Sequence, residues 1–155
     1  MADGNWQWLR DFKDWSEAVA YIDSLANPNI GYAIELTEDI ELDVPLTLPE
    51  NAAELVIRGW GDKQIELTCT GDISLSSLVA VTNIKLNASN STVKLNGFNL
   101  IFDEGSIAYI GKAVGTEESI LAAFNKSAIM IGKAATGLAG LEAMWGSRIE
   151  LGMDN

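Results

Sequence analysis

The chain has 155 residues, a length that fits one domain and allows a sizeable hydrophobic core. Hydrophobic residues make up 48% of it, which argues against intrinsic disorder. The net charge of −12 predicts repulsion from nucleic acid and from anionic membranes. The absence of His removes the commonest general base and the commonest metal ligand. No clean run of about 20 apolar residues occurs, so insertion into a membrane is not expected.

A leading helical segment is predicted over residues 6–26. Asp14 is a suitable N-cap, and Glu17 follows at the spacing of a capping box. Apolar residues then recur at helical steps as far as Leu25, and Pro28 ends the pattern.

Three tryptophans lie in or before this helix: Trp6, Trp8 and Trp15. We expect the segment to cover the open end of a stacked core, because a bare end would expose apolar side chains and unpaired strands. The alternative is that Trp6 and Trp8 are exposed and bind sugar rings.

Short alternating runs typical of β-strands fill the next region. They cover residues 33–37, 40–44, 45–49, 54–58, 64–68, 72–75, 81–86, 92–95 and 98–102. Two spacings indicate stacked coils with a step of 27–28 residues, namely Ile65 to Val93 and Ile73 to Leu100. A cluster of asparagines is consistent with ordinary turns or with a stacked asparagine ladder. It comprises Asn87, Asn90, Asn96 and Asn99.

A similar sequence motif, which we call the repeated phrase, occurs three times in the last third of the chain. The copies are Ser106–Ala113, Ser127–Ala134 and Ser147–Gly152. Their glycines, at 111, 132 and 152, repeat at a step of 20–21 residues. A fixed step of this size with one short strand per copy predicts a solenoid.

The segments between these copies have residue patterns typical of helices. Thr116 is a suitable N-cap for residues 117–124, and Leu138, Leu141 and Met144 or Trp145 recur at helical steps. We therefore expect alternating strands and short helices in the last third, with parallel strands.

No residue pattern predicts a catalytic, cofactor-binding or metal site, and a ligand-binding site is not identified. Cys69 lies in an apolar run and is expected to be a buried small hydrophobe. Lys112 and Lys133 follow Ile-Gly, but Ala in place of Ser or Thr excludes a phosphate-binding loop, and both are expected in turns.

Several acidic groups are candidate calcium ligands or paired catalytic carboxylates. Because no calcium-binding loop is present in the sequence, we favour the interpretation that these side chains lie on the solvated surface. They are Glu38–Asp39, Asp43, Asp103–Glu104 and Glu117–Glu118.

Four segments together resemble the opening of right-handed parallel β-helix domains of the pectate-lyase-like superfamily, in secreted or cell-surface bacterial proteins. They are Trp15–Ile22, Tyr32–Ile40, Pro45–Pro49 and Leu55–Gly59. The resemblance covers residues 15–102 and implies a helix leading into the first coils. It carries over no catalytic residue. The regular step near the C-terminus departs towards a leucine-rich-repeat-like solenoid, and both forms stay open for the last third.

The sequence thus predicts a mainly β protein, a right-handed parallel β-helix with an N-terminal helical cap and short helices in its last third. One solenoid domain spans residues 1–155, with the cap at 1–29, the first coils at 30–104 and the regular repeats at 105–155.

A non-catalytic extracellular or cell-surface module is expected, with a structural, adhesin-like or glycan-binding role. A polysaccharide lyase or hydrolase and a phage or appendage structural protein of the virion are the alternatives. Polysaccharide or a host or cell-surface protein is the expected partner, together with self-association at the C-terminal end. No signal peptide is visible at residues 1–5, as in a mature or trimmed exported form.

Overall fold

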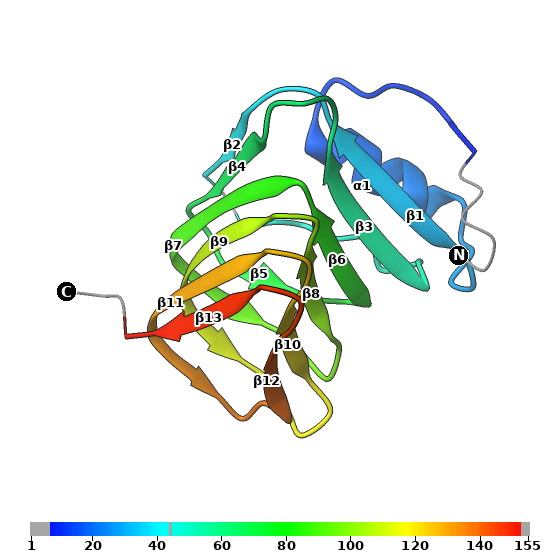
Figure 1. Ribbon diagram of the computed structural model, residues 1–155. Helices are drawn as coiled ribbons and strands as arrows, with labels where there is room; N and C mark the ends of the chain where they lie inside the picture. Colours follow the sequence, from blue (N-terminus) through cyan, green and yellow to red (C-terminus); the bar gives the residue numbers. More distant parts are fainter. Residues whose placement is uncertain (1–6, 44, 153–155) are drawn as a thin grey trace.

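The computed structural model describes residues 7–43 and 45–152, which wind into a parallel β-solenoid of about 6 turns (Figure 1). The elements are α1 (Trp15–Ser24), β1 (Gly31–Leu36), β2 (Ile40–Leu42), β3 (Glu54–Gly59), β4 (Ile65–Cys69), β5 (Ile73–Ser74), β6 (Leu78–Thr82), β7 (Ile84–Lys94), β8 (Leu100–Asp103), β9 (Ile107–Val114), β10 (Ile120–Ala123), β11 (Ala128–Thr136), β12 (Gly140–Ala143) and β13 (Arg148–Leu151). The predicted mainly β, parallel architecture with an N-terminal helical cap is confirmed.

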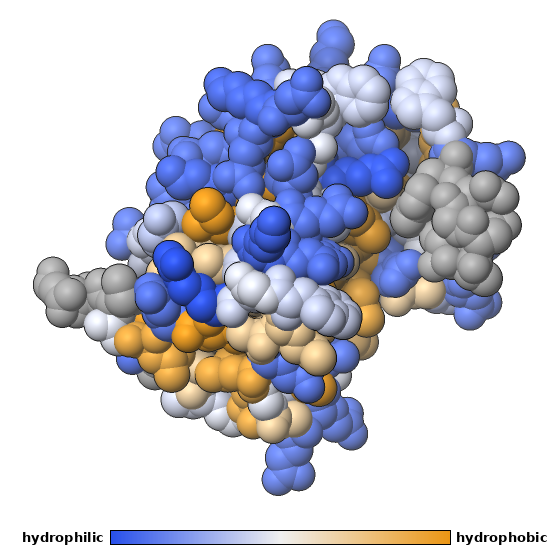
Figure 2. All heavy atoms as spheres, in the orientation of Figure 1, coloured by the Kyte–Doolittle hydropathy of each residue, from blue (hydrophilic) through white to orange (hydrophobic). Residues whose placement is uncertain are grey.

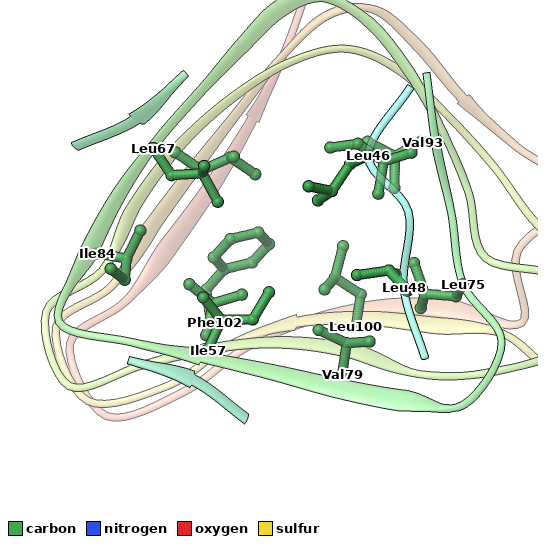
Figure 3. Close-up of a pocket in the computed structure, with 13 residues that line it drawn as sticks. Leu46, Leu48, Ile57, Leu67, Leu75, Val79, Ile84, Val93, Leu100 and Phe102 are labelled. Atoms are coloured by element: carbon green, nitrogen blue, oxygen red, sulfur yellow. The ribbon is translucent and has the colours of Figure 1, made fainter. Parts of the chain in front are cut away.

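The strands form three faces around a common interior. The first face is the sheet β1-β3-β6-β8-β10-β12, and the second sheet has the order β13-β11-β9-β7-β4-β2 with β5 beside β7. The long strands β7, β9 and β11 bend, because three residues of β7 between Ala88 and Thr92 face a single residue of β9. Their first halves lie on the second face and their second halves, with β5, on the third. Figure 3 shows the resulting triangular section with apolar side chains pointing inward.

Strand alternation builds the core, since every second residue of a strand points to the same side. On the first face Val79, Leu100 and Leu121 are register partners and all are buried. On the second face Ala108 and Ile129 are register partners, with the same sequence separation as Leu100 and Leu121. The regular step predicted from the repeated phrase is therefore correct, and it is the length of one complete coil.

The longer step predicted for the middle of the chain is wrong. Ile65 pairs with Ile84 and Ile73 pairs with Val93, so the coils here are at least as short as those of the last third. The error comes from joining residues 81–86 into one strand. The chain instead turns a corner at Asn83, whose φ of 53° ends β6 and lets β7 begin on the next face.

The short helices predicted in the last third are also wrong. Residues 120–123 form β10 and residues 140–143 form β12, and both pair in parallel register. Leu121 and Ala123 point inward at the period of a strand. A helix advances about 1.5 Å per residue against about 3.3 Å for a strand, so a coil of this length would not close around the core if part of it were helical.

The helix α1 closes the core at the β1 end of the solenoid (Figure 1). It begins at Trp15, because the Asp14 side chain accepts a hydrogen bond from the Glu17 N–H as the capping-box spacing predicts. The residues before it, from Gln7 to Asp14, are not helical, so the predicted start at residue 6 was too early. The buried stripe of α1 consists of Trp15, Ala18, Val19 and Ile22.

A column of serines, buried except in the last coil, links the coils. Ser106 Oγ accepts from the Ile84 N–H at 3.2 Å, and Ser127 Oγ accepts from the Ser106 N–H at 3.1 Å. Ser147 Oγ accepts from the Ser127 N–H at 3.0 Å. These serines open the three copies of the repeated phrase, and their hydroxyl groups accept hydrogen bonds from backbone N–H groups of the preceding coil. The Ser106 N–H also donates to the Asp103 carbonyl at 3.2 Å.

Of the two alternatives for the asparagine cluster, the hydrogen bonds of the described residues favour ordinary turns over a stacked ladder of amides. Asn96 donates to the Leu75 carbonyl, and Asn99 accepts from the Ile120 N–H. Each of these asparagines therefore joins its own side chain to the backbone of a neighbouring coil, which is the ordinary role of asparagine in turns.

Candidate functional site

The chain turns from the first face to the second through a left-handed backbone in each of the last four coils. The turn begins at Asn83, Glu104, Asn125 and Trp145, with φ between 52° and 54°, and in the last three coils the following residue, Gly105, Lys126 or Gly146, is left-handed as well. Their regular spacing stacks the turns into one edge of the solenoid. We call the line of side chains along this edge, formed by Trp60, Asn83, Asp103, Asn125 and Trp145, the first corner.

Trp60 stands on the first corner in the second coil, between β3 and β4. Its N–H donates to the Leu36 carbonyl at 2.8 Å, which fixes the backbone. Gly59 is needed beside it, because a Cβ there would lie 2.5 Å from the Asn83 carbonyl oxygen. The indole itself is 65% exposed, so a firmly held backbone presents a large aromatic surface to solvent.

Polar side chains continue the first corner. The Asn83 side chain donates to the Gly61 carbonyl at 3.4 Å, and the Asn125 side chain donates to Asp103 Oδ1 at 2.7 Å. The Asp103 carboxylate also accepts from the Glu104 N–H. These contacts hold amide and carboxylate groups at the surface of three successive coils, where their remaining donors and acceptors face solvent.

The first corner ends in a second aromatic group. The ring of Trp145 lies 5.2 Å from that of Phe124, centroid to centroid, and Trp145 is 63% exposed. Successive coils of a parallel sheet are about 4.8 Å apart, and Trp60 and Trp145 lie on the earliest and the last of the coils that contribute to the first corner, with the polar groups on the coils between them. Aromatic faces next to hydrogen-bonding groups are the chemistry that carbohydrate recognition uses, because a sugar ring has apolar C–H faces and a rim of hydroxyls.

The sequence left open, as the alternative to a cap, that Trp6 and Trp8 are exposed and bind sugar rings. Trp6 lies outside the described residues, and Trp8 is 74% exposed and belongs to no helix or strand. The sequence pattern did not identify the residues of the first corner as one site. Its signal was the regular spacing of the turn residues Asn83, Glu104 and Asn125, which becomes visible once the coil length is known.

The acidic groups considered as metal ligands or catalytic pairs are dispersed. Asp39 accepts from the Glu66 N–H, and Asp103 belongs to the first corner. Glu38, Asp43, Glu104, Glu117 and Glu118 are exposed. Within residues 7–43 and 45–152, no group of three or more acidic or Cys side chains is arranged to hold a metal ion.

Other acidic side chains join one coil to the next through ion pairs. Glu35 pairs with Arg58, Glu66 with Lys85 at 3.3 Å, and Asp72 with Lys94 at 3.7 Å. These partners lie on adjacent coils of the solenoid. Exposed pairs of this kind contribute little stability each, about 0–1 kcal/mol.

The prediction that Lys112 and Lys133 lie in turns is wrong. They lie within β9 and β11, at the bend between the second and third faces. Gly111, before Lys112, is required there because a Cβ would lie 2.7 Å from the Ser89 carbonyl oxygen. Both lysines are exposed, and Gly111 serves close packing of the backbone.

Cys69 is buried at the end of β4, as predicted. Burial raises the pKa of the Cys69 thiol from its ordinary 9.0 to about 11, because the thiolate would lose its hydration inside the core. A protonated, enclosed thiol is a poor nucleophile.

The raised pKa of Cys69 predicts a pH-dependent loss of stability. In the unfolded chain the thiol ionises above about pH 9, whereas in the folded chain it stays protonated up to about pH 11. The stability that Cys69 contributes below pH 9 is therefore lost as the pH rises to 11, by up to about 2–3 kcal/mol. Urea unfolding across this range should show a steeper decline for the natural chain than for Cys69→Ala. Parallel declines would contradict this prediction.

The interior holds a small cavity of about 20 Å³ lined only by apolar side chains (Figure 3). Phe102, Leu67 and Val93 are among them, from the first, second and third faces. A cavity without polar partners stays dry, so this space is a packing defect and offers no ligand a hydrogen bond.

Comparison with family models, with curated proteins and with solved structures gave no match. No helix among the described residues has the length and apolar character needed to cross a membrane.

Proposed function

We propose that this protein is a non-catalytic structural module that binds a neutral glycan chain along the first corner. The exposed indole of Trp60, on a backbone held by the Leu36 carbonyl and by Gly59, is the observation that carries the proposal. A rigid aromatic platform loses little conformational entropy when a sugar ring stacks on it.

The row of polar groups below Trp60 supports the same proposal. Asn83, Asp103 and Asn125 follow at intervals of one coil, and this interval is close to the length of one sugar unit in an extended polymer. Each successive sugar could therefore place a hydroxyl against one amide or carboxylate. The net charge of −12 disfavours polyanionic glycans, which is why the proposal specifies a neutral chain.

The proposal includes an extracellular or cell-surface location. The helix that leads into the first coils supports it, since this arrangement accompanies the resemblance of residues 15–102 to the pectate-lyase-like superfamily. The fold alone does not define a function, so the proposal rests on the first corner.

A binding assay on immobilised neutral polysaccharides tests the proposal. The natural chain should bind at least one of them, and Trp60→Ala should weaken that binding by at least about tenfold, because a stacked ring loses its partner. Trp8→Ala is the matched control, since Trp8 is similarly exposed but lies outside the first corner, and it should bind normally.

Three results would contradict the proposal in different ways. Absence of binding to every neutral glycan would remove the glycan-binding role. Loss of binding in Trp8→Ala and not in Trp60→Ala would move the site to the N-terminal segment. New reducing ends or unsaturated products after incubation would show that the protein is an enzyme.

A further inference from the structure

The two ends of the solenoid differ. At the β13 end, β12 and β13 stand last in their sheet orders, so each pairs with a neighbour on one side only among the described strands. Apolar side chains are exposed there, including Leu141, Met144 and Leu151. Figure 2 shows apolar side chains gathered over the lower part of the molecule, where Figure 1 places β11, β12 and β13.

The other end is closed by α1. Trp15, Val19 and Ile22 are buried against the first coil, so this end offers a second molecule no open core. Stacking of one copy head to tail on another is therefore blocked. A self-association that uses the open end has to bring two such ends together about a two-fold axis, which is the commonest symmetry of homodimers.

We propose that two copies of this chain associate end to end through β13, paired antiparallel about Ile149. The alternation of β13 supports this register. Ile149 packs against the core and is the register partner of buried Ile129, whereas Arg148 and Glu150 lie on the outer side. Residues directly opposite each other in an antiparallel pair point to the same side of the sheet. The two-fold axis must therefore pass through a residue of β13 and not between two residues, because only then do inward-facing residues of one copy lie opposite inward-facing residues of the other.

Charge then selects among these registers. Centring on Ile149 places Arg148 opposite the partner's Glu150 on the outer side and the two Ile149 side chains opposite each other on the inner side. Within one chain Arg148 Nε already lies 3.7 Å from Glu150 Oε1, so the dimer would hold a ring of four alternating charges. Centring on Arg148 or on Glu150 would oppose like charges, which is destabilising.

Sedimentation equilibrium of the full chain over micromolar to millimolar concentrations tests the proposal. The natural chain should show a monomer–dimer equilibrium. Arg148→Glu should weaken the dimer by about tenfold or more, because two carboxylates would then face each other at two places in the interface. The double variant Arg148→Glu/Glu150→Arg should restore dimerisation, because the opposite charges are exchanged and still match.

Lys94→Glu is the control for the change of net charge, since Lys94 lies on the third face and pairs with Asp72. It should dimerise like the natural chain, and circular dichroism should confirm that all variants fold. A chain that stays monomeric at all concentrations would overturn the proposal. The β13 end would then be a surface for another protein or for a further chain segment. A dimer unaffected by Arg148→Glu, or not restored in the double variant, would overturn the register. Neither result depends on glycan binding.

Discussion

Trp15→Ala is expected to destabilise the protein by about 3–5 kcal/mol, the range for removing a buried tryptophan side chain. Trp15 is 4% exposed and packs against the first coil from α1. Its Nε1 donates to the Thr47 carbonyl at 2.6 Å, so the substitution also removes a hydrogen bond that ties the helix to the third face. A large part of the cap should loosen with it, because the helix has only one buried stripe.

Urea unfolding monitored by circular dichroism measures this effect. Trp8→Ala is the matched control, and it should change the free energy of unfolding by less than about 0.5 kcal/mol because the indole is exposed. If both tryptophan variants unfolded at the same urea concentration, α1 would not be the cap of the core.

Phe102→Ala is the second large effect, with an expected loss of about 4 kcal/mol. Phe102 is fully buried on β8, with Val81 and Ala123 as its register partners on the coils before and after. The ring fills the middle of the triangular section next to the small cavity (Figure 3). Its removal would enlarge a void that already exists, and neighbouring coils cannot close in because their strands are hydrogen-bonded on both sides.

Phe98→Ala provides the same chemical change at a half-exposed position in the turn before β8. It is expected to cost clearly less than Phe102→Ala in the same urea experiment, since Phe98 is already 38% exposed and its removal opens no cavity inside the core. Equal losses for the two phenylalanines would mean that Phe102 does not face a shared interior.

The parts of the fold that were predictable rest on local, repeated signals. Asp14 and the apolar stripe after it predict α1 and its N-cap. The regular step of the repeated phrase predicts stacked parallel strands, and the register of Ala108 with Ile129 confirms it. Both signals lie within short stretches of sequence, where period and capping act directly on the backbone.

The parts that were missed depend on which residues turn a corner. Asn83 adopts a left-handed backbone between two strands that the sequence pattern joined into one, so the length of the coils in the middle of the chain was overestimated. Residues 117–124 have helical character on their own, yet pairing with β8 and β12 makes four of them a strand. Tertiary hydrogen bonding outweighs local propensity in both places.

The candidate site depends on the same corners. The place of Trp60 on the same corner as Asn83 and Asn125 follows only from the true coil length. A sequence pattern cannot place side chains from different coils in one line until the register between the coils is known.

Backbone nuclear Overhauser effects between neighbouring strands test the stacking of the coils most directly. In a parallel, in-register solenoid the amide and Hα protons around Ala108 should show contacts with those around Leu86 and Ile129, its register partners. Strong contacts between Hα protons of neighbouring strands, which mark antiparallel pairing, should be absent. Such Hα–Hα contacts between residues 84–94 and residues 107–114 would show strands running in opposite directions and would contradict the solenoid.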